Sequence, residues 1–339
     1  MTQTKNPFVS ILIPIRNEAA TIVRCLEAVF SQDYPAEQVE ILIADGLSDD
    51  GTREILAALE GSHPRVRVFN NPGRIVPTGL NLLIPHARGE VLIRVDGHCL
   101  IAPDYVSKCV AHLAKGEVDG VGGPMHSVGE DQVSQTIALA MSSKFGVGGS
   151  AFRTETGETK LVDTVPFPAY TRAIIERVGL YDEALVRDQD DEYNYRIRKH
   201  GGKILLAADV RSTYYSRGSL GKLWRQYFQY GFYKVRVLQK HPRQMRPRQF
   251  VPPAFVLALL LGIVLSLAFP WGWIALLGLA GGYLIANLLA SLLTAARAGW
   301  HHFWLLPPAF ATLHISYGLG FLAGLVKFWN RWRESADRE

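Results

Sequence analysis

The carboxyl-terminal part of this 339-residue sequence is dominated by apolar residues. Between residues 251 and 326, Arg297 is the only charged residue, and the apolar segments 251–269, 271–293 and 303–326 follow one another. Each segment is close to the ~20 residues that an α-helix needs to cross a bilayer. The sequence therefore predicts a chain bound to a membrane by its carboxyl-terminal part, preceded by a domain of mixed charge.

The charges that flank the apolar segments bear on their topology. The basic run 234–248 precedes them, and by the positive-inside rule it places the upstream domain in the cytoplasm. Residues 1–8 are polar, and we expect no amino-terminal signal peptide. Three crossings would put the basic tail 327–339 outside, against the same rule. A re-entrant or interfacial segment, or a hairpin near Pro307, would remove this conflict, and the sequence leaves these alternatives open.

The upstream domain alternates short apolar runs with segments of helical spacing. The runs predicted to be strands are 9–15, 39–44, 66–69 and 91–95, and the predicted helices between them are 18–30, 51–59 and 78–86. Such alternation predicts an α/β fold, in which helices cover both faces of a mostly parallel sheet. In sheets of this kind, ligands bind beyond the carboxyl ends of the strands.

Asp45 and Asp96 each follow one of these predicted strands. Asp45 opens the sequence Asp-Gly-Leu-Ser-Asp-Asp-Gly, which is typical of a turn that caps a helix, and this alternative stays open. The functional interpretation is a carboxylate that accepts hydrogen bonds from a nucleoside. Asp96-Gly97-His98 could hold a divalent cation, Mg²⁺ or Mn²⁺, that bridges two phosphates. The alternative for His98 is an ordinary hydrogen-bonded polar residue.

A third polar cluster, Asp188-Gln-Asp-Asp-Glu192, precedes an arginine-rich helical segment. Acidic residues at a helix start are favoured by the helix dipole, so capping is one explanation. A single cap does not need four carboxylates, however. Crowded like charges raise the pKa of at least one carboxyl group, which suits a general base.

Between Arg196 and Arg248, Asp209 is the only acidic residue. A basic stretch next to apolar segments favours anionic lipid headgroups, and we expect no nucleic acid because no recognised nucleic-acid module is present. The segment 220–239 is predicted to be an amphipathic helix at the membrane surface, or else an ordinary packed helix. The Gly- and Thr-rich segment 142–164 predicts a mobile surface loop. The three cysteines have no metal or redox spacing.

In combination, these motifs resemble the family 2 inverting glycosyltransferases of the GT-A (Rossmann-like) fold. The matching segments are 9–18, 41–52, 71–73 with 79–81, 94–98, and 189–193 with Arg196 and Gly201. Within the family, the Asp-Gly-His variant, the acidic cluster and the membrane segments look like the succinoglycan-type exopolysaccharide transferases. Gln189 and His98 stand where the family pattern has acids.

The resemblance assigns roles to particular positions. The residues implied for the nucleotide-sugar site are Pro14, Arg16, Glu18, Asp45, Gly73, Arg74 and Asp96. Asp96 and His98 fall on the family's metal motif, and Asp190 falls on its catalytic base. Trp224, Arg225 and Gln226 match, more loosely, an acceptor or diphosphate motif.

The implied protein is an inner-membrane, multi-pass hexosyltransferase with a cytoplasmic catalytic domain, acting in exopolysaccharide biosynthesis. It would move a sugar from a UDP-sugar to a hydroxyl of a polyprenyl-diphosphate-linked glycan. The predicted division is a catalytic domain (1–217), an interface helix and linker (218–250), transmembrane helices (251–326) and a basic tail (327–339). The alternatives are a polyprenyl-phosphate glycosyltransferase of the dolichol-phosphate-mannose-synthase type and a non-catalytic membrane scaffold. A processive synthase is disfavoured because it needs more membrane helices.

Overall fold

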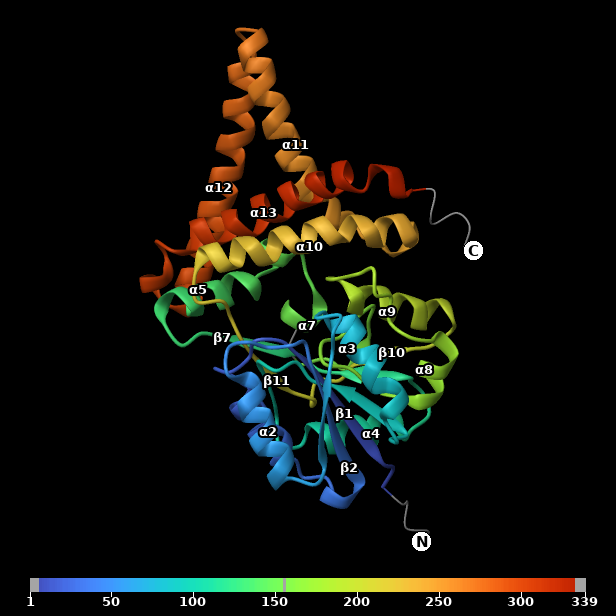
Figure 1. Ribbon diagram of the computed structural model, residues 1–339. Helices are drawn as coiled ribbons and strands as arrows, with labels where there is room; N and C mark the ends of the chain where they lie inside the picture. Colours follow the sequence, from blue (N-terminus) through green and yellow to red (C-terminus); the bar gives the residue numbers. More distant parts are fainter. Residues whose placement is uncertain (1–5, 155–156, 333–339) are drawn as a thin grey trace. The chain divides into compact units, whose positions relative to one another are not determined.

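The computed structural model describes residues 6–154 and 157–332. The chain divides into two compact units. The first unit comprises Met1–His126 and Glu155–Tyr214, and the second comprises Ser127–Thr154 and Tyr215–Glu339. Figure 1 follows the chain by colour. The chain therefore passes from one unit to the other three times.

The first unit is built on an eight-stranded sheet with the order β3-β2-β1-β4-β9-β6-β10-β8. Its strands are β1 (Val9–Ile15), β2 (Val39–Asp45), β3 (Val66–Asn70), β4 (Val91–Arg94), β6 (Gly120–Gly122), β8 (Lys160–Leu161), β9 (Ala169–Thr171) and β10 (Ile204–Leu206). The β1–β2, β1–β4, β2–β3 and β6–β10 pairs are parallel, whereas β9 is antiparallel to β4 and β6 and β8 is antiparallel to β10. The predicted α/β fold with a mixed, mostly parallel sheet is confirmed.

Every residue of β1 and β2 is buried, as a central parallel strand with both faces covered requires. The covering helices are α1 (Ile22–Phe30), α2 (Thr52–Ser62), α3 (Val76–Leu83), α4 (Tyr105–Leu113), α8 (Arg172–Val178) and α9 (Gln189–Lys199), with 3-10 turns at Ala36–Gln38 and Ile84–His86. α3 packs on β1 and β2 because the crossover from β3 to β4 passes over both strands. A smaller sheet has the order β5-β11-β7, with strands β5 (Cys99–Ile101), β7 (Met125–Val128) and β11 (Ser212–Tyr215).

Glu40 is a buried charge inside this sheet. It accepts hydrogen bonds from Ser10 Oγ at 2.7 Å, from the Arg88 backbone N–H at 2.6 Å and from Arg88 Nε at 3.0 Å. Burial would raise the pKa of Glu40, but these hydrogen bonds and the Arg88 charge outweigh it and lower that pKa. The carboxylate therefore ties β1 and β2 to the segment that leads into β4.

The second unit is helical. Its helices are α5 (Gln132–Met141), α6 (Lys144–Val147), α7 (Ala151–Thr154), α10 (Leu220–Lys240), α11 (Pro247–Ala268), α12 (Gly272–Ala298) and α13 (Leu306–Lys327), with 3-10 turns at Pro242–Gln244, Trp300–His302 and Trp329–Arg331. Segments far apart in sequence meet in it: Thr136 Oγ1 lies 2.7 Å from His302 Nδ1, and His314 Nε2 lies 2.9 Å from the Phe145 carbonyl oxygen.

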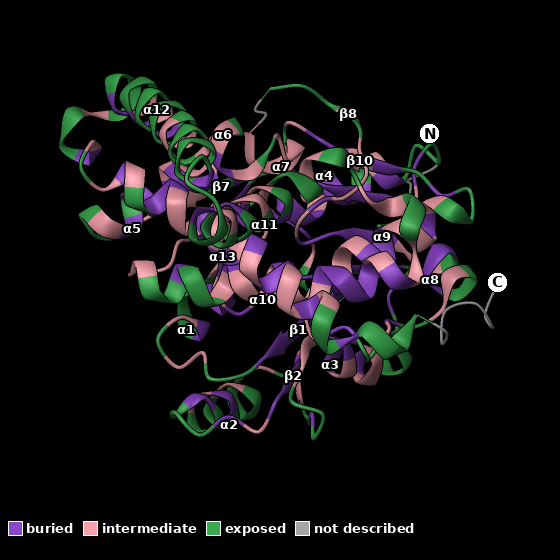
Figure 2. Ribbon diagram, turned by 90° about the horizontal axis from the view of Figure 1, so that it is seen from above, coloured by how far each residue is buried: buried purple, intermediate pink, exposed green. Residues whose placement is uncertain are grey.

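Three helices in the described part of the chain, α11, α12 and α13, are long and apolar enough to cross a membrane. Large apolar residues on α11 and α12 are exposed. In Figure 2 much of the α12 ribbon has the green of exposed residues. Leu267, for example, is 80% exposed and Ile274 is 74% exposed. Such exposure is expected of helices that face lipid.

The segment 142–164 differs from the expectation of a loop. α6 and α7 lie within the predicted loop 142–164, and β8 closes it. Residues 127–154 also group with the carboxyl-terminal unit, although the sequence-based division assigned them to the catalytic domain. The partners of this segment are distant in sequence, so local patterns carry no sign of them.

Candidate active site

Four neighbouring strands, β3, β2, β1 and β4, end at the same edge of the first unit's sheet. In their parallel register Ile15 lies opposite Asp45, and Asp45 lies opposite Asn70. The residues predicted to bind the donor lie at or beyond these strand ends: Gly73 and Arg74 follow β3, Asp45 ends β2, Arg16 and Glu18 follow β1, and Asp96 and His98 follow β4. Pro14 is buried inside β1. The topology therefore brings the predicted donor site to one edge.

The Asp45 carboxylate is almost fully buried. Ser48 Oγ donates a 2.5 Å hydrogen bond to Asp45 Oδ1, and the Ser48 backbone N–H lies 3.3 and 3.2 Å from the two carboxylate oxygens. Arg53 Nε lies 3.6 Å from Asp45 Oδ2. These contacts are the ones expected if Asp45 stabilises a turn. Asp45 does not cap α2, because the N-cap residue of that helix is Gly51.

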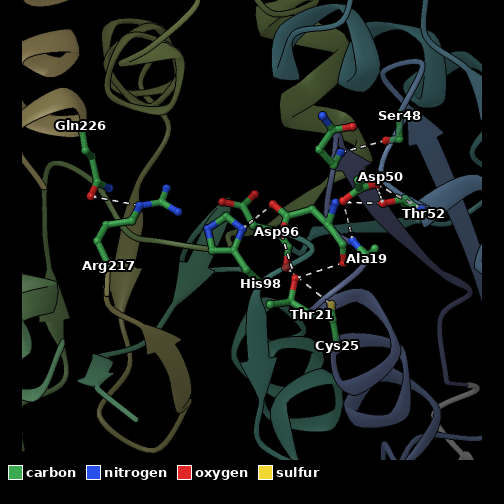
Figure 3. Close-up of polar contacts among 12 residues, drawn as sticks. Ala19, Thr21, Cys25, Ser48, Asp50, Thr52, Asp96, His98, Arg217 and Gln226 are labelled. Carbon is green, nitrogen blue, oxygen red and sulfur yellow. Dashed lines mark hydrogen bonds and ion pairs between the residues drawn. The ribbon is translucent and has the colours of Figure 1, made fainter. Parts of the chain in front are cut away.

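The loop after β2 is fastened to the loop after β1. The Asn17 backbone N–H donates to Ser48 Oγ at 2.8 Å, that of Glu18 donates to Thr52 Oγ1 at 2.9 Å, and that of Ala19 donates to Asp50 Oδ2 at 3.1 Å. Figure 3 shows Ser48, Asp50 and Thr52 beside Ala19. Two motifs that are separate in the sequence therefore form one wall of the site.

The turn after β3 is set by Asn71. Its side-chain oxygen accepts a hydrogen bond from the Gly73 backbone N–H at 3.2 Å, and its amide donates to the Ile75 carbonyl at 3.0 Å. Arg74 has a φ of 59° and is exposed. Gly79, in α3, allows that helix to approach β1 closely, because a Cβ there would lie 3.2 Å from Pro14 Cβ. The exposed Arg74 side chain thus lies beyond the strand end, where an anionic ligand could reach it.

His98 is oriented by Glu18. The Nδ1 atom of His98 lies 2.8 Å from Glu18 Oε1, and Thr21 Oγ1 donates to Glu18 Oε2 at 2.8 Å. In Figure 3 the His98 ring lies beside Asp96. A carboxylate at Nδ1 favours the tautomer that carries a proton there and leaves Nε2 as a lone-pair donor, as in many metal-bound histidines. Glu18 was predicted to line the nucleoside pocket, and in the structure its carboxylate contacts His98 and Thr21.

Arg94 connects the two aspartates predicted to act in catalysis. It is the last residue of β4 and is 6% exposed. Its Nη2 and Nε atoms lie 2.8 and 2.9 Å from Asp96 Oδ1, and Nη1 contacts Asp190 Oδ1. Burial would lower the pKa of Arg94, but the negative charge of Asp96 outweighs it and raises that pKa. Asp96 and Asp190 are thus held together by one buried, charged guanidinium.

The other members of the acidic cluster on α9 have different contacts. Glu192 is buried and accepts hydrogen bonds from Arg196 Nε at 2.5 Å and Nη2 at 3.0 Å. Gln189 is buried as well, and its Oε1 atom accepts no hydrogen bond from the residues that the structure describes. Asp188, the N-cap residue, has a φ of 61° and makes no side-chain cap to the helix. Asp190, with 35% of its side chain exposed, is the member that joins Asp96.

Asp96 and His98 are the available donors for a divalent cation at this edge. Among the residues described, no group of three or more His, Cys, Asp or Glu side chains could by itself hold a metal ion. Asp96 Oδ1 contacts Arg94, and His98 Nδ1 contacts Glu18. The atoms that could bind a cation are therefore Asp96 Oδ2 and His98 Nε2. A set of one carboxylate and one imidazole fits a cation that is completed by substrate phosphates and water, as Mg²⁺ sites commonly are.

The predicted acceptor-side residues Trp224, Arg225 and Gln226 lie on α10, in the second unit. Trp224 is 39% exposed. Gln226 accepts a hydrogen bond from Arg217 Nε at 3.4 Å and donates one to Tyr230 Oη at 2.9 Å. Arg225 is exposed. Their role stays a prediction.

Comparison with known structures identifies the fold. A mannosyltransferase from Pyrobaculum calidifontis, solved in complex with GDP-Man and Mn²⁺, superposes with a TM-score of 0.60 at 22% identity, over 94% of this chain and 88% of that one. A second neighbour is the structure of GalNAc-T7 with UDP, GalNAc and Mn²⁺, which has a TM-score of 0.50 and 20% identity and covers 73% of this chain and 52% of that one. The first unit thus has the GT-A fold of nucleotide-sugar-dependent transferases.

Sequence comparison identifies the family. The model described as Glycosyl transferase family 2 matches residues 10–180. The succinoglycan biosynthesis protein ExoA of Rhizobium meliloti is 34% identical over 72% of this chain and 76% of its own length. A dolichyl N-acetyl-α-D-glucosaminyl phosphate 3-β-D-2,3-diacetamido-2,3-dideoxy-β-D-glucuronosyltransferase of Methanococcus voltae is 28% identical over 94% of this chain and 98% of its own. The chain belongs to glycosyltransferase family 2 and is a glycosyltransferase.

Proposed function

We propose that this glycosyltransferase moves a sugar from a nucleotide-sugar, most simply a UDP-sugar, to a hydroxyl of a polyprenyl-diphosphate-linked glycan, with inversion at the anomeric carbon. The observation that carries the proposal is the pairing of Asp96 and Asp190 on the buried guanidinium of Arg94. Asp96 is expected beside the diphosphate, and Asp190 is suited to accept a proton. Their shared contact with Arg94 brings the two carboxylates close together.

Asp190 is proposed as the general base. A sugar hydroxyl is a poor nucleophile, so its attack on the anomeric carbon is faster when a carboxylate accepts the proton. The side chain of Asp190 is 35% exposed, so an acceptor hydroxyl can approach it. Inversion follows because the hydroxyl attacks from the side opposite the departing nucleoside diphosphate.

The donor would lie along the strand ends. Asp45 and Arg16 are proposed to contact the nucleoside, and Gly73 and Arg74 the neighbouring part of the nucleotide. The Arg74 guanidinium offers a charge and a fork of N–H donors that match phosphate oxygens. In the second unit Trp224, Arg225 and Gln226 are proposed to face the acceptor or its diphosphate, for which an exposed arginine and tryptophan are suited.

Asp96 and His98 are proposed to hold a divalent cation together with the donor's diphosphate. The contact between Glu18 and His98 Nδ1 supports this role because it leaves Nε2 as a lone-pair donor. When bound, Mg²⁺ or Mn²⁺ would neutralise charge on the leaving group. Two solved GT-A neighbours were crystallised with Mn²⁺, which is consistent with this choice.

The name of one relative supports a lipid-linked acceptor, and the apolar helices α11, α12 and α13 support a membrane location. ExoA is named for succinoglycan biosynthesis, and the Methanococcus voltae protein is named for transfer to a dolichyl-phosphate-linked sugar. We infer a multi-pass protein of exopolysaccharide biosynthesis with its catalytic unit in the cytoplasm. A transferase that glycosylates polyprenyl monophosphate itself is the second candidate, but its acceptor is already an anion and would not use Asp190 as a base.

The test is an Asp190→Asn variant assayed for metal-dependent UDP release with two acceptors, a polyprenyl-diphosphate-linked sugar and polyprenyl monophosphate. We expect transfer to the sugar hydroxyl to fall by about 100- to 10,000-fold, the usual contribution of a general base. Glu176→Gln, an exposed carboxylate on α8, is the matched control and keeps full activity. Undiminished hydroxyl transfer by Asp190→Asn, or transfer by the wild type to polyprenyl monophosphate alone, contradicts the proposal.

A further inference from the structure

α10 and α13 of the second unit lie side by side, as Figure 1 shows. Their backbones are in direct contact at glycines: a Cβ on any of these would overlap a carbonyl oxygen of the other helix. The glycines are Gly231 on α10, facing Tyr317, and Gly320 and Gly324 on α13, facing Phe228 and Phe232. At the far end Gln239 Nε2 donates a 2.7 Å hydrogen bond to the Phe328 carbonyl oxygen. The two helices therefore share one direction over the second half of each.

α10 cannot cross a bilayer. It carries five basic residues along its length, Lys222, Arg225, Lys234, Arg236 and Lys240. On insertion scales a Lys or Arg at the centre of a membrane helix costs about 2.5–3.5 kcal/mol, so five of them forbid insertion. With aromatic and aliphatic residues between these charges, α10 suits the plane of the membrane surface.

Because α13 is packed along α10, it must take the same orientation. In the most apolar 18-residue stretch of α13, 44% of the residues are buried within the protein. The corresponding shares are 22% for α11 and 11% for α12. His314, in the middle of α13, uses both ring nitrogens: Nδ1 lies 3.0 Å from Tyr283 Oη and Nε2 lies 2.9 Å from the Phe145 carbonyl oxygen. α13 is thus more buried by the rest of the protein than α11 or α12 is.

α11 and α12 have the features of a spanning pair. In Figure 1 they project together to a shared tip, away from α10 and α13. With 22 and 27 residues they are about 33 and 40 Å long, enough for the ~30 Å hydrocarbon core. Their charged residues lie at one end, with Arg246 and Arg248 near the start of α11 and Arg297 near the end of α12. The tip carries Trp271 and Trp273, 55% and 52% exposed, as expected at a lipid–water interface.

From these observations we infer that only α11 and α12 cross the bilayer, as a hairpin, and that the α10–α13 pair lies in the membrane surface on the side of the catalytic unit. With two crossings, the basic residues 243–248 and Arg297, Lys327 and Arg331 are all on one side of the membrane. The topology then obeys the positive-inside rule, which three crossings violate. The inference does not depend on the substrate.

Single cysteines test this arrangement in the full-length protein. The native Cys25, Cys99 and Cys109 are buried, and burial raises the pKa of Cys25 to about 12, so they react slowly. New cysteines at exposed positions mark the catalytic unit (Glu54→Cys), the tip of the hairpin (Trp271→Cys) and the 3-10 turn that follows α13 (Asn330→Cys). Each is treated with a membrane-impermeant maleimide in sealed vesicles of both orientations, and only variants that retain metal-dependent UDP release are compared.

We expect Asn330→Cys to react from the same side as Glu54→Cys, and Trp271→Cys from the opposite side. Three crossings would instead group Asn330→Cys with Trp271→Cys, and an uninserted hairpin would make all three react from one side. Either result overturns the inference. Trypsin provides a second measurement without substitution: cleavage after Lys327 or Arg331 must occur only in vesicles whose catalytic unit is also digested.

Discussion

Substituting Arg94 tests whether Asp96 and Asp190, the proposed cation ligand and base, depend on a shared counter-charge. Arg94→Met leaves Asp96 and Asp190 together without a cation, and removing one partner of a buried ion pair costs about 3–5 kcal/mol. Because 24% of the Asp96 side chain and 35% of the Asp190 side chain are exposed, hydration of the two carboxylates offsets part of this cost. We therefore expect the free energy of unfolding to fall by about 2–3 kcal/mol.

Arg94→Lys separates charge from geometry. Lysine keeps the positive charge but cannot place Nε, Nη1 and Nη2 on two carboxylates at once. We expect it to retain most of the stability yet to lower kcat by about 100-fold with little change in KM, because a small displacement of the base and the cation ligand disrupts the reacting geometry. The assay combines steady-state UDP release at saturating metal with urea unfolding.

The control for this pair is Arg53→Lys, since Arg53 forms a longer, 3.6 Å contact with Asp45 and is 49% exposed. Its effect on stability should stay within about 1 kcal/mol, the usual worth of an exposed ion pair. If Arg94→Met unfolds at the wild-type urea concentration and both Arg94 variants turn over at the wild-type rate, the reasoning about the shared guanidinium is refuted.

Three further predictions follow from contacts within a single unit. Glu18→Gln removes the carboxylate that orients His98, and we expect the metal concentration for half-maximal activity to rise about 10- to 100-fold; an unchanged metal titration contradicts this role. Gly320→Leu forces α13 away from α10 and should lower the melting temperature in detergent by several degrees, whereas Gly281→Leu on α12, where a Cβ meets nothing within 4 Å, should match the wild type. Hydrogen bonds lower the pKa of Glu40 in the folded protein, so its stabilising contribution is present at neutral pH and lost as the pH falls through about 4; the wild type should lose more unfolding free energy on acidification than Glu40→Gln does.

Much of the first unit could be predicted from sequence because its signals are local. A short, continuous apolar run such as Val9–Ile15 is typical of a central strand that is buried on both faces. The carboxyl ends of parallel strands lie at the same edge of a sheet, independently of the loop sequences. Asp45, Asp96 and His98 could therefore be placed at one edge before the structure was known. The composition of the segment after Asp45 also predicted a turn. Its hydrogen bond to Asn17 could not be predicted, because the two segments are far apart in the sequence.

Arg94 was missed as a functional residue for a physical reason. A single basic residue at the end of a buried strand has no periodicity, and its partner Asp190 lies 96 residues later in the chain. The only available signal was the presence of a charge among residues that are otherwise apolar, since a buried arginine must be paired. The number of membrane crossings was open for a similar reason: α13 is apolar enough to span a membrane, and the inference about its orientation rests on its contact with the basic α10, which is distant in sequence.

Residues 127–154 belong to the helical unit, although they lie between two parts of the first unit in the sequence. A single truncation therefore cannot separate the first unit from the helical unit. A protein truncated after Tyr214 would still contain α5, which packs against α10 and α13 and would lose their cover. We expect such a fragment to aggregate during purification. A soluble form would require the truncation together with replacement of 127–154 by a short polar linker.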